Sequence, residues 1–307
     1  MIWTWIIVFV ASFYATIRLS NLVISQALKY SHLHKISLLT TGFFFGAVFT
    51  SLPELIISTI SAVMKANEIA LGNVLGGNIT EILLISSVVF ISSKHFSISN
   101  QRMEKIKKAL LFSILLSILI LSVNKLDWII GSVLVLLYTF FVFFHLYGKK
   151  LPPFRKKETK NIFKFSFSMI TLIIASLFLI ISVREIALET RISEIFFGAI
   201  IISIGTSLPN LILVVNAMRE GSPSLAIGSV IGDCIFNLAF SLGTSAIINP
   251  IAIFTPLVSF LVGFFILGSV FVIYSLEHLK NYEAAFFLIT SYALYIFFFY
   301  FLFSVLK

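Results

Sequence analysis

Two short polar motifs recur inside otherwise hydrophobic sequence, and both place oxygen-bearing side chains beside a proline. Residues 50–54 read Thr-Ser-Leu-Pro-Glu, and residues 206–210, which lie 156 positions later, read Thr-Ser-Leu-Pro-Asn. Proline removes a backbone donor and clashes with the preceding turn, so each apolar stretch is expected to break or kink there and to expose carbonyl oxygens. The adjacent hydroxyl groups belong to Thr50, Ser51, Thr206 and Ser207. Because hard cations prefer oxygen ligands, the motifs predict a cation site.

A second pair of motifs follows at the same offset, in residues 72–81 and 228–237. Only three of the 13 acidic residues lie deep in the repeated motifs: Glu54, Glu81 and Asp233. Charged groups at the bilayer centre are costly and are usually functional. The offset pairs Glu54 with Asn210, Glu81 with Asn237, and Gly77 with Asp233. We therefore predict a site of lopsided charge, in which the three acids converge on one cavity near the middle of the membrane and both asparagines present amide oxygens to it.

Composition places these motifs in a membrane protein. The chain is 59% hydrophobic and 11% charged, with a mean hydropathy of +1.07, and about 20 apolar residues suffice to span a bilayer. We predict an all-α integral membrane protein with about ten transmembrane helices. The expected spans are roughly residues 2–28, 36–64, 69–92, 106–123, 127–147, 162–182, 192–218, 224–248, 252–274 and 283–305. The first lacks a basic segment before it and a small-residue cleavage site after it, so it is expected to be a retained helix rather than a signal peptide.

The net charge of +9 is explained by membrane topology rather than by a nucleic-acid partner. With ten spans, Lys and Arg gather in alternate loops, as the positive-inside rule requires of cytoplasmic loops. Residues 147–164 form the most basic of these loops. We predict a multi-pass protein of the cell membrane with the N-terminus outside and the basic loops in the cytoplasm. Its expected partners are the lipid bilayer and small cations.

The basic loop also divides the chain into two halves. Residues 1–146 and 165–307 are each expected to form five helices, around repeat motifs at about 42–83 and 198–239, with 147–164 as a cytoplasmic linker. Because five is odd, the second half must enter the membrane from the opposite side. Inverted repeats of this kind, with discontinuous ligand-bearing helices, are typical of secondary transporters.

At these residues the sequence resembles the calcium/cation antiporter superfamily, and within it the compact prokaryotic sodium/calcium exchangers. The resemblance implies Ca²⁺ and Na⁺ as transported ions. We predict that Glu54, Glu81 and Asp233 are charged ligands. The predicted neutral ligands are Thr50, Ser51, Gly77, Thr206, Ser207, Asn210 and Asn237. The sequence departs from the family pattern, which usually has Glu at position 210, Ser at positions 77 and 233, Asn at 81 and Asp at 237. Only Glu54 stands where the family places an acid.

The leading hypothesis is a Na⁺/Ca²⁺ antiporter that works by alternating access. Desolvation disfavours the charged form of an acid, so proton-coupled exchange of Ca²⁺ or another divalent ion on the same fold is the alternative. A cation channel is the third hypothesis. No nucleophile–base pair or nucleotide motif is found, so an enzyme and an organic cofactor are not expected. Oligomeric state is left open, with a monomer plausible.

Residues outside these motifs are expected to have ordinary roles. The single cysteine, Cys234, should be a buried small hydrophobic residue. The five histidines are expected at solvated or interfacial positions. Arg18 lies within the first apolar stretch, and either reaches the interface with its long side chain or marks a water-accessible path.

Overall fold

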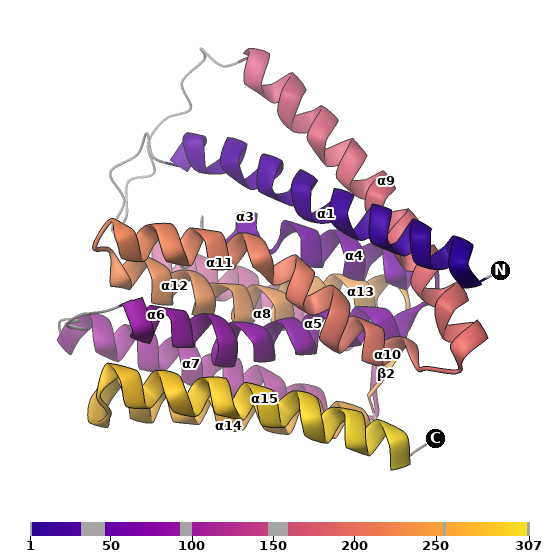
Figure 1. Cartoon of the computed structure of the whole chain (residues 1–307). Helices are drawn as coiled ribbons and strands as arrows, with labels where there is room; N and C mark the ends of the chain where they lie inside the picture. The colour runs from indigo at the N-terminus through magenta and orange to yellow at the C-terminus, as the bar shows by residue number, and fades with distance from the viewer. Residues whose placement is uncertain (1, 32–46, 93–99, 147–158, 254–255, 306–307) are drawn as a thin grey trace.

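The computed structural model describes residues 2–31, 47–92, 100–146, 159–253 and 256–305, and these form a bundle of long helices (Figure 1). The first half contains α1 (Ile2–Ser31), α3 (Ala47–Thr50), α4 (Leu52–Val63), α5 (Asn67–Ile79), η2 (Thr80–Ile85), α6 (Ser86–Ser92), α7 (Asn100–Leu121) and α8 (Trp128–Leu146). The second half contains α9 (Thr159–Thr190), α10 (Glu194–Phe196), η3 (Phe197–Ile202), α11 (Ser203–Arg219), α12 (Pro223–Ile235), η4 (Phe236–Ser241), α13 (Leu242–Ile248), α14 (Pro256–His278) and α15 (Asn281–Val305). The segments named η are π-helical turns.

The described helices have the length and composition of membrane spans. Seven of them are long and apolar enough to cross a bilayer. Two more, Leu52–Val63 and Trp128–Phe144, are apolar but shorter. The all-helical membrane fold is therefore confirmed for this part of the chain, whereas the total of ten spans stays a prediction.

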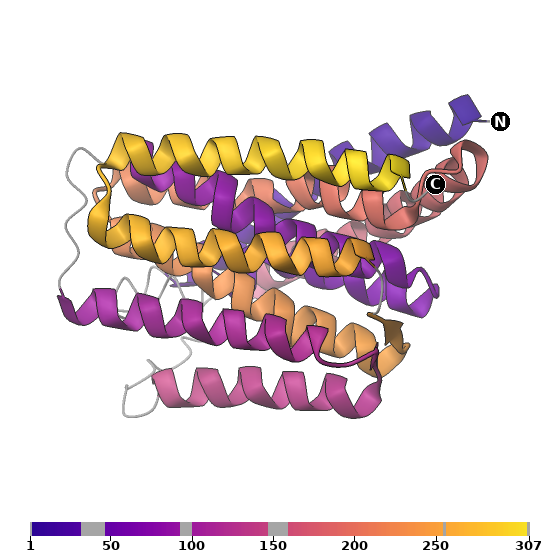
Figure 2. The same ribbon diagram turned by 90° about the horizontal axis from the view of Figure 1, so that it is seen from below.

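The helices are arranged around a central group formed by the repeat motifs. Helices α1 and α9 pack along each other on one side of the bundle. On the opposite side α14 packs between α7 and α15, as the view from below shows (Figure 2). A two-residue antiparallel pairing of β1 (Lys125–Leu126) with β2 (Ile251–Ala252) ties the α7–α8 connection to the α13–α14 connection.

Contacts at the two ends of the bundle show that the repeats run in opposite directions. At one end Asn67, the first residue of α5, donates through Nδ2 to the carbonyl of Pro250, just after α13 (2.9 Å). At the other end Arg102, which follows α6, donates to the hydroxyl of Ser224 near the start of α12 (3.3 Å). The segments 67–92 and 223–248 are therefore antiparallel, as inverted repeats require. We call these ends the Asn67 end and the Arg102 end.

A reciprocal contact marks the pseudo-twofold axis between the repeats. Asn78 donates through Nδ2 to the carbonyl of Cys234 (3.2 Å), and the Cys234 thiol lies 3.9 Å from the carbonyl of Asn78. The two residues are 156 positions apart, which is the offset of the repeat. Each residue thus meets its own counterpart, so the two repeats touch at equivalent points.

Glycines let the repeat helices approach until their backbones touch. A Cβ atom on Gly72 would lie 2.8 Å from the backbone nitrogen of Ala199, and one on Gly198 would lie 2.8 Å from the carbonyl of Ile69. Neither position has room for a side chain. Helix α5 therefore packs directly on η3, which brings the polar motifs of the two repeats together.

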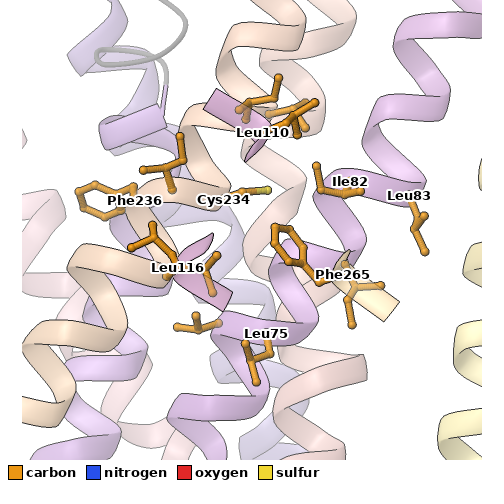
Figure 3. Close-up of a cluster of buried hydrophobic side chains, with 14 of the residues drawn as sticks. Leu75, Ile82, Leu83, Leu110, Leu116, Cys234, Phe236 and Phe265 are labelled. Carbon is orange, nitrogen blue, oxygen red and sulfur yellow. The ribbon is translucent and has the colours of Figure 1, made fainter. Parts of the chain in front are cut away.

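The largest buried hydrophobic cluster lies beside this contact (Figure 3). Leu75, Ile82 and Leu83 of the first repeat meet Cys234 and Phe236 of the second. Cys234 is fully buried, which confirms the role predicted for it. The apolar cluster holds the central helices rigidly in place, and so it fixes the polar side chains that the same helices carry.

The two proline motifs differ in their backbone. In the first repeat α3 ends at Thr50 and α4 begins at Leu52. The helix is therefore interrupted at Ser51, two residues before Pro53, as predicted. In the second repeat α11 continues through Pro209, so of the predicted break or kink at that position the break is wrong and the kink stays a prediction. The irregular segment there is the π-helical turn η3, which ends just before α11. Residues 42–46 of the first motif and residues 147–158 of the expected linker lie outside the described residues.

Candidate functional site

The site is built from two kinds of local irregularity in the central helices. The interruption at Ser51 precedes α4, whose third residue is Glu54. Glu81 and Asn237 are the second residues of η2 and η4, at positions related by the offset of 156. A π-helical turn inserts one extra residue into a helix and is frequent at functional sites. The sequence thus places two offset-related candidate ligands on widened turns at the centre of the bundle.

Every predicted site residue is removed from the surface. Side chains that are at most 2% exposed belong to Thr50, Ser51, Glu54, Glu81, Thr206, Ser207, Asn210, Asp233 and Asn237. Gly77 is buried as well, and a Cβ on it would meet only the Ser207 hydroxyl, at 3.9 Å. Gly77 therefore leaves open space beside Ser207, unlike Gly72 in the same helix.

Asn210 joins two of the three acids. Its Nδ2 donates to Glu81 Oε2 at 2.6 Å and lies 3.4 Å from Asp233 Oδ2. Its Oδ1 accepts a hydrogen bond from the Ser229 hydroxyl (2.5 Å). The prediction that Asn210 presents its amide oxygen to the acids is therefore wrong, because its amide nitrogen faces them.

The third acid stands beside this pair. Glu54 is close enough to Asp233 and to Glu81 for their charges to interact. The Thr206 hydroxyl of the second repeat lies next to Glu54, and the Thr50 hydroxyl of the first repeat lies next to Asp233. Each repeat thus supplies a hydroxyl group to an acid that the other repeat carries.

The three acids do not form a metal site of three carboxylates. Among the described residues no three side chains of the Asp, Glu, His or Cys type are close enough to hold one metal ion. An ion held in this arrangement would contact at most two of the carboxylates. Its remaining ligands would be neutral oxygens. The convergence of the three acids on one cavity stays a prediction.

Several buried oxygens of the site have no hydrogen-bond partner among the described residues. They are Oε1 and Oε2 of Glu54, Oε1 of Glu81, Oδ1 of Asp233, and the hydroxyls of Ser51 and Ser207. The four ion pairs formed by described residues all lie elsewhere, near the ends of the bundle. Buried unpaired acceptors are costly, and hard cations satisfy such oxygens. These oxygen atoms therefore fit the ligand set of a hard cation.

Two residues that sequence reasoning missed support this site. Asn73 accepts a hydrogen bond from the Thr206 hydroxyl (3.2 Å) and donates to the Glu54 carbonyl (3.3 Å) and to the Ser58 hydroxyl (3.1 Å). Its counterpart at the offset of 156 is Ser229, which bonds Asn210. Both belong to the second motif, so their repetition at that offset was a signal that could have identified them.

The other candidates are less closely tied to the acids. Asn237 is buried and its Oδ1 accepts from the Ser241 hydroxyl (3.4 Å), and its role as an ion ligand stays a prediction. Arg18 is exposed on α1 and donates to the Tyr14 hydroxyl (2.8 Å). His278 is exposed next to Tyr274. The side chains of His32, His34, His95 and His145 lie outside the description.

Comparisons with known proteins identify the family and the fold of the chain. The family model described as "Sodium/calcium exchanger protein" matches residues 4–147 and 160–301. The inner membrane protein YrbG of Escherichia coli strain K12 is 26% identical over 225 residues, which are 66% of this chain and 66% of that protein. The sodium/calcium exchanger MaX1 of Methanosarcina acetivorans is 32% identical over 94 residues, 31% of this chain and 27% of that one. A structure of the sodium-calcium exchanger NCX_Mj superimposes with a TM-score of 0.68 at 20% identity, covering 96% of this chain and 98% of that one, and so it shares the fold.

Proposed function

Because the chain belongs to the sodium/calcium exchanger protein family, we propose that it is a secondary active antiporter that exchanges Ca²⁺ for Na⁺. The proposal rests most directly on the buried group of Glu54, Glu81 and Asp233. These acids lie between two inverted repeats and have no basic partner in the part of the chain that the structure describes. Each negative charge there requires a counter-charge, which transported cations supply.

We propose two neighbouring cation positions. One uses Glu81 and Asp233, whose carboxylates both contact the Asn210 amide. The other uses Glu54 together with the hydroxyls of Thr206 and Ser207. A divalent ion suits the pair of acids, because two carboxylates balance its charge. Sodium ions, with one charge each, would occupy both positions, so that the same oxygens serve the two ions in alternation.

A polar route leads from the site toward the Asn67 end. Ser58 and Ser61 follow Glu54 by one and two helical turns on α4 and are buried, whereas their counterparts in the second repeat are Val214 and Ala217. Ser241 and Ser245 follow Asn237 in the same way, whereas their counterparts in the first repeat are Ile85 and Val89. Both serine pairs lie on the side of the site nearer the Asn67 end, since α4 and α13 finish there. We propose that ions pass between the site and that end along these hydroxyls.

Proton-coupled exchange is the second candidate. The observation that favours it is the contact between Glu81 and Asp233 through one amide group. Two carboxylates held this close need a counter-charge at all times, and a proton can supply it in place of one Na⁺. This mechanism uses the same residues and the same fold, so only the coupling ion separates the two candidates.

Reconstituted vesicles distinguish these functions. Vesicles loaded with Na⁺ should take up ⁴⁵Ca²⁺ in proportion to the outward Na⁺ gradient, and the Glu54→Gln variant serves as the matched inactive control. Uptake driven by a pH gradient in Na⁺-free buffer would indicate proton coupling. Single-channel currents without a counter-ion requirement would indicate a channel. An intact wild-type protein that shows no gradient-dependent uptake would refute antiport.

We propose that the protein lies in the cell membrane with the Asn67 end outside, together with the N-terminus. The two halves, residues 1–146 and 165–307, would then be joined by a cytoplasmic linker at 147–164, and one copy of the chain holds the whole site. Cys234 is fully buried, so it gives a low background for labelling. A cysteine introduced at Lys65 should react with an impermeant maleimide from outside intact cells, whereas one at Lys105 should not. The reverse pattern would invert the orientation.

A further inference from the structure

Helix α15 directs two buried tyrosine hydroxyls at the central helices. Tyr292 and Tyr295 are three residues apart and therefore share a helix face. They are 6% and 0% exposed, whereas Phe297 and Tyr300 on the same helix are 63% and 62% exposed. Each tyrosine reaches a π-helical turn in a different repeat, η2 for Tyr292 and η3 for Tyr295.

Tyr292 is linked to η2 through Thr80, the first residue of that turn. The Thr80 hydroxyl lies 3.1 Å from the Tyr292 hydroxyl and donates to the carbonyl of Gly76 (2.9 Å). A threonine hydroxyl has only one proton. Because Gly76 receives it, the Tyr292 hydroxyl must donate to Thr80. The result is a chain of two hydrogen bonds, from α15 to the backbone one turn before Glu81.

Tyr295 bonds a carbonyl that lacks its regular α-helical partner in the π-helical turn η3. The Ser203 amide, at the end of η3, bonds the carbonyls of Gly198 and Ile200. The carbonyl of Ala199 lies between these two, and it accepts from the Tyr295 hydroxyl (3.0 Å) and from the Ser203 hydroxyl (2.6 Å). Two side-chain donors therefore replace the regular helical bond at Ala199.

The two turns position the two partners of one contact in the site. Glu81 follows Thr80 in η2, and Asn210 lies on α11, the helix that continues from η3. Asn210 and Glu81 are bonded at 2.6 Å. Helix α15 thus bonds the turn that carries Glu81 and the turn that precedes the helix of Asn210. Its two hydroxyls contact neither of those two residues directly.

The opposite half shows an equivalent arrangement, which supports a role for the last helix of each half. Helix α8 closes the first half and packs on η4 of the second. The Tyr138 ring on α8 meets the Phe236 ring edge-on, with centroids 5.3 Å apart. Phe236 is the counterpart of Thr80 at the offset of 156. The last helix of each half, α8 or α15, therefore places a tyrosine in contact with the first residue of a π-helical turn in the other half, η4 or η2.

We propose that Tyr292 and Tyr295 are positioning residues for ion exchange. They hold η2 and η3 at fixed positions relative to each other, so that Glu81 and Asn210 stay in contact. This inference rests on the proposed function for its transport readout. The hydroxyl of Tyr292 acts through Thr80 and so fixes the turn that bears Glu81. The hydroxyl of Tyr295 acts on Ala199 and so fixes the start of α11.

Two double-mutant cycles test the two contacts. Tyr292 and Thr80 act in series, so Tyr292→Phe combined with Thr80→Val should raise the apparent KM for Ca²⁺ no more than Thr80→Val alone does. Tyr295 and Ser203 act in parallel on one carbonyl. Tyr295→Phe combined with Ser203→Ala should therefore raise the apparent KM for Ca²⁺ by more than the two single changes predict when they are added as free energies. For Tyr292→Phe we expect an apparent KM for Ca²⁺ about 2- to 10-fold higher, the effect of one lost hydrogen bond, and a changed ratio of Ca²⁺ to Sr²⁺ affinity.

Two further variants control for general destabilisation. Thr80→Ser keeps the hydroxyl that Thr80→Val removes, so it should keep the wild-type affinity for Ca²⁺. Tyr300→Phe removes an exposed hydroxyl and should leave that affinity unchanged. Amide hydrogen exchange supplies a readout that does not depend on transport, because Tyr292→Phe should speed exchange in residues 79–86 while Tyr300→Phe does not. Independent effects in both cycles, with unchanged exchange in η2, would overturn the inference. A wild-type protein without Ca²⁺ uptake would instead refute the antiport proposal, and the hydrogen-exchange comparison would still decide the role of Tyr292.

Discussion

Adjacent glycines in α5 give the sharpest test of how the repeats pack. A Cβ on Gly76 would overlap the carbonyl oxygen of Ala199 and lie 2.5 Å from its Cα and 2.7 Å from its carbonyl carbon. A Cβ on Gly77 would meet only the Ser207 hydroxyl, at 3.9 Å. The two substitutions to alanine are chemically identical and one residue apart. They should nevertheless change stability in opposite directions.

The magnitudes follow from these distances. Ordinary carbon contacts need about 3.5 Å or more, so Gly76→Ala must push α5 away from η3 by roughly 1 Å. Overpacking of this kind costs about 1–3 kcal/mol or more, and each kcal/mol lowers Tm by about 2 °C in a protein somewhat larger than about 250 residues. Gly77→Ala fits its space and gains about 1 kcal/mol of helix propensity. We expect a fall in Tm of several degrees at position 76, and no fall or a slight rise at position 77.

Thermal unfolding in detergent measures both variants, and vesicle uptake of ⁴⁵Ca²⁺ adds the functional comparison. Gly76→Ala should lose most transport, because Ala199 belongs to the turn that positions α11. Gly77→Ser should fold normally and change the apparent affinity for Ca²⁺, since it adds a hydroxyl beside Ser207. Equal Tm values for the two alanine variants would show that α5 and η3 are not in backbone contact, and the packing described here would be refuted.

The remaining predictions concern the acids and the polar route. Glu54→Gln should abolish exchange while leaving Tm in cation-free detergent unchanged or higher, because it removes a buried unpaired charge; retained uptake would exclude Glu54 as a ligand. Asn210→Glu should lower Tm without cations and enlarge the Ca²⁺-induced rise in Tm, since it replaces a donor to two carboxylates with a fourth acid in the site, and adding Asp233→Ser should return both values toward wild type. Independent effects in that double-mutant cycle would place Asp233 outside the site. Ser61→Ala removes a buried hydroxyl without a partner among the described residues, so it should raise Tm slightly and slow uptake; a rise in Tm with unchanged uptake would argue against the polar route.

Much of the fold could be predicted from sequence, because its causes are local or repeated. Apolar length alone located the helices, and α5 through α6 begins and ends within a few residues of the expected span. The offset of 156 predicted two equivalent halves, and the contact between Asn78 and Cys234 carries the same offset. Residue type also identified Glu54, Glu81 and Asp233 as buried acids, because few other forces place a carboxylate in apolar sequence.

Other features depend on contacts between distant segments, which no local pattern encodes. The uninterrupted course of α11 through Pro209 was not predictable, because the irregular backbone moved to η3, where Tyr295 from α15 satisfies the open carbonyl. The orientation of the Asn210 amide was mistaken for the same reason. Its direction is set by Ser229 on one side and Glu81 on the other, and their proximity becomes visible only once the helices are packed.

The cross-repeat pairing gives the unusual acid pattern a physical explanation. Glu81 from the first repeat and Asp233 from the second both meet one amide group, which stabilises two like charges that would otherwise only repel each other. Asn210 serves this pair because its amide donates, which a glutamate at that position could not do without carrying a proton. The Asn at position 210 is therefore coupled to the acids at 81 and 233, so the three positions should be substituted together and not one at a time.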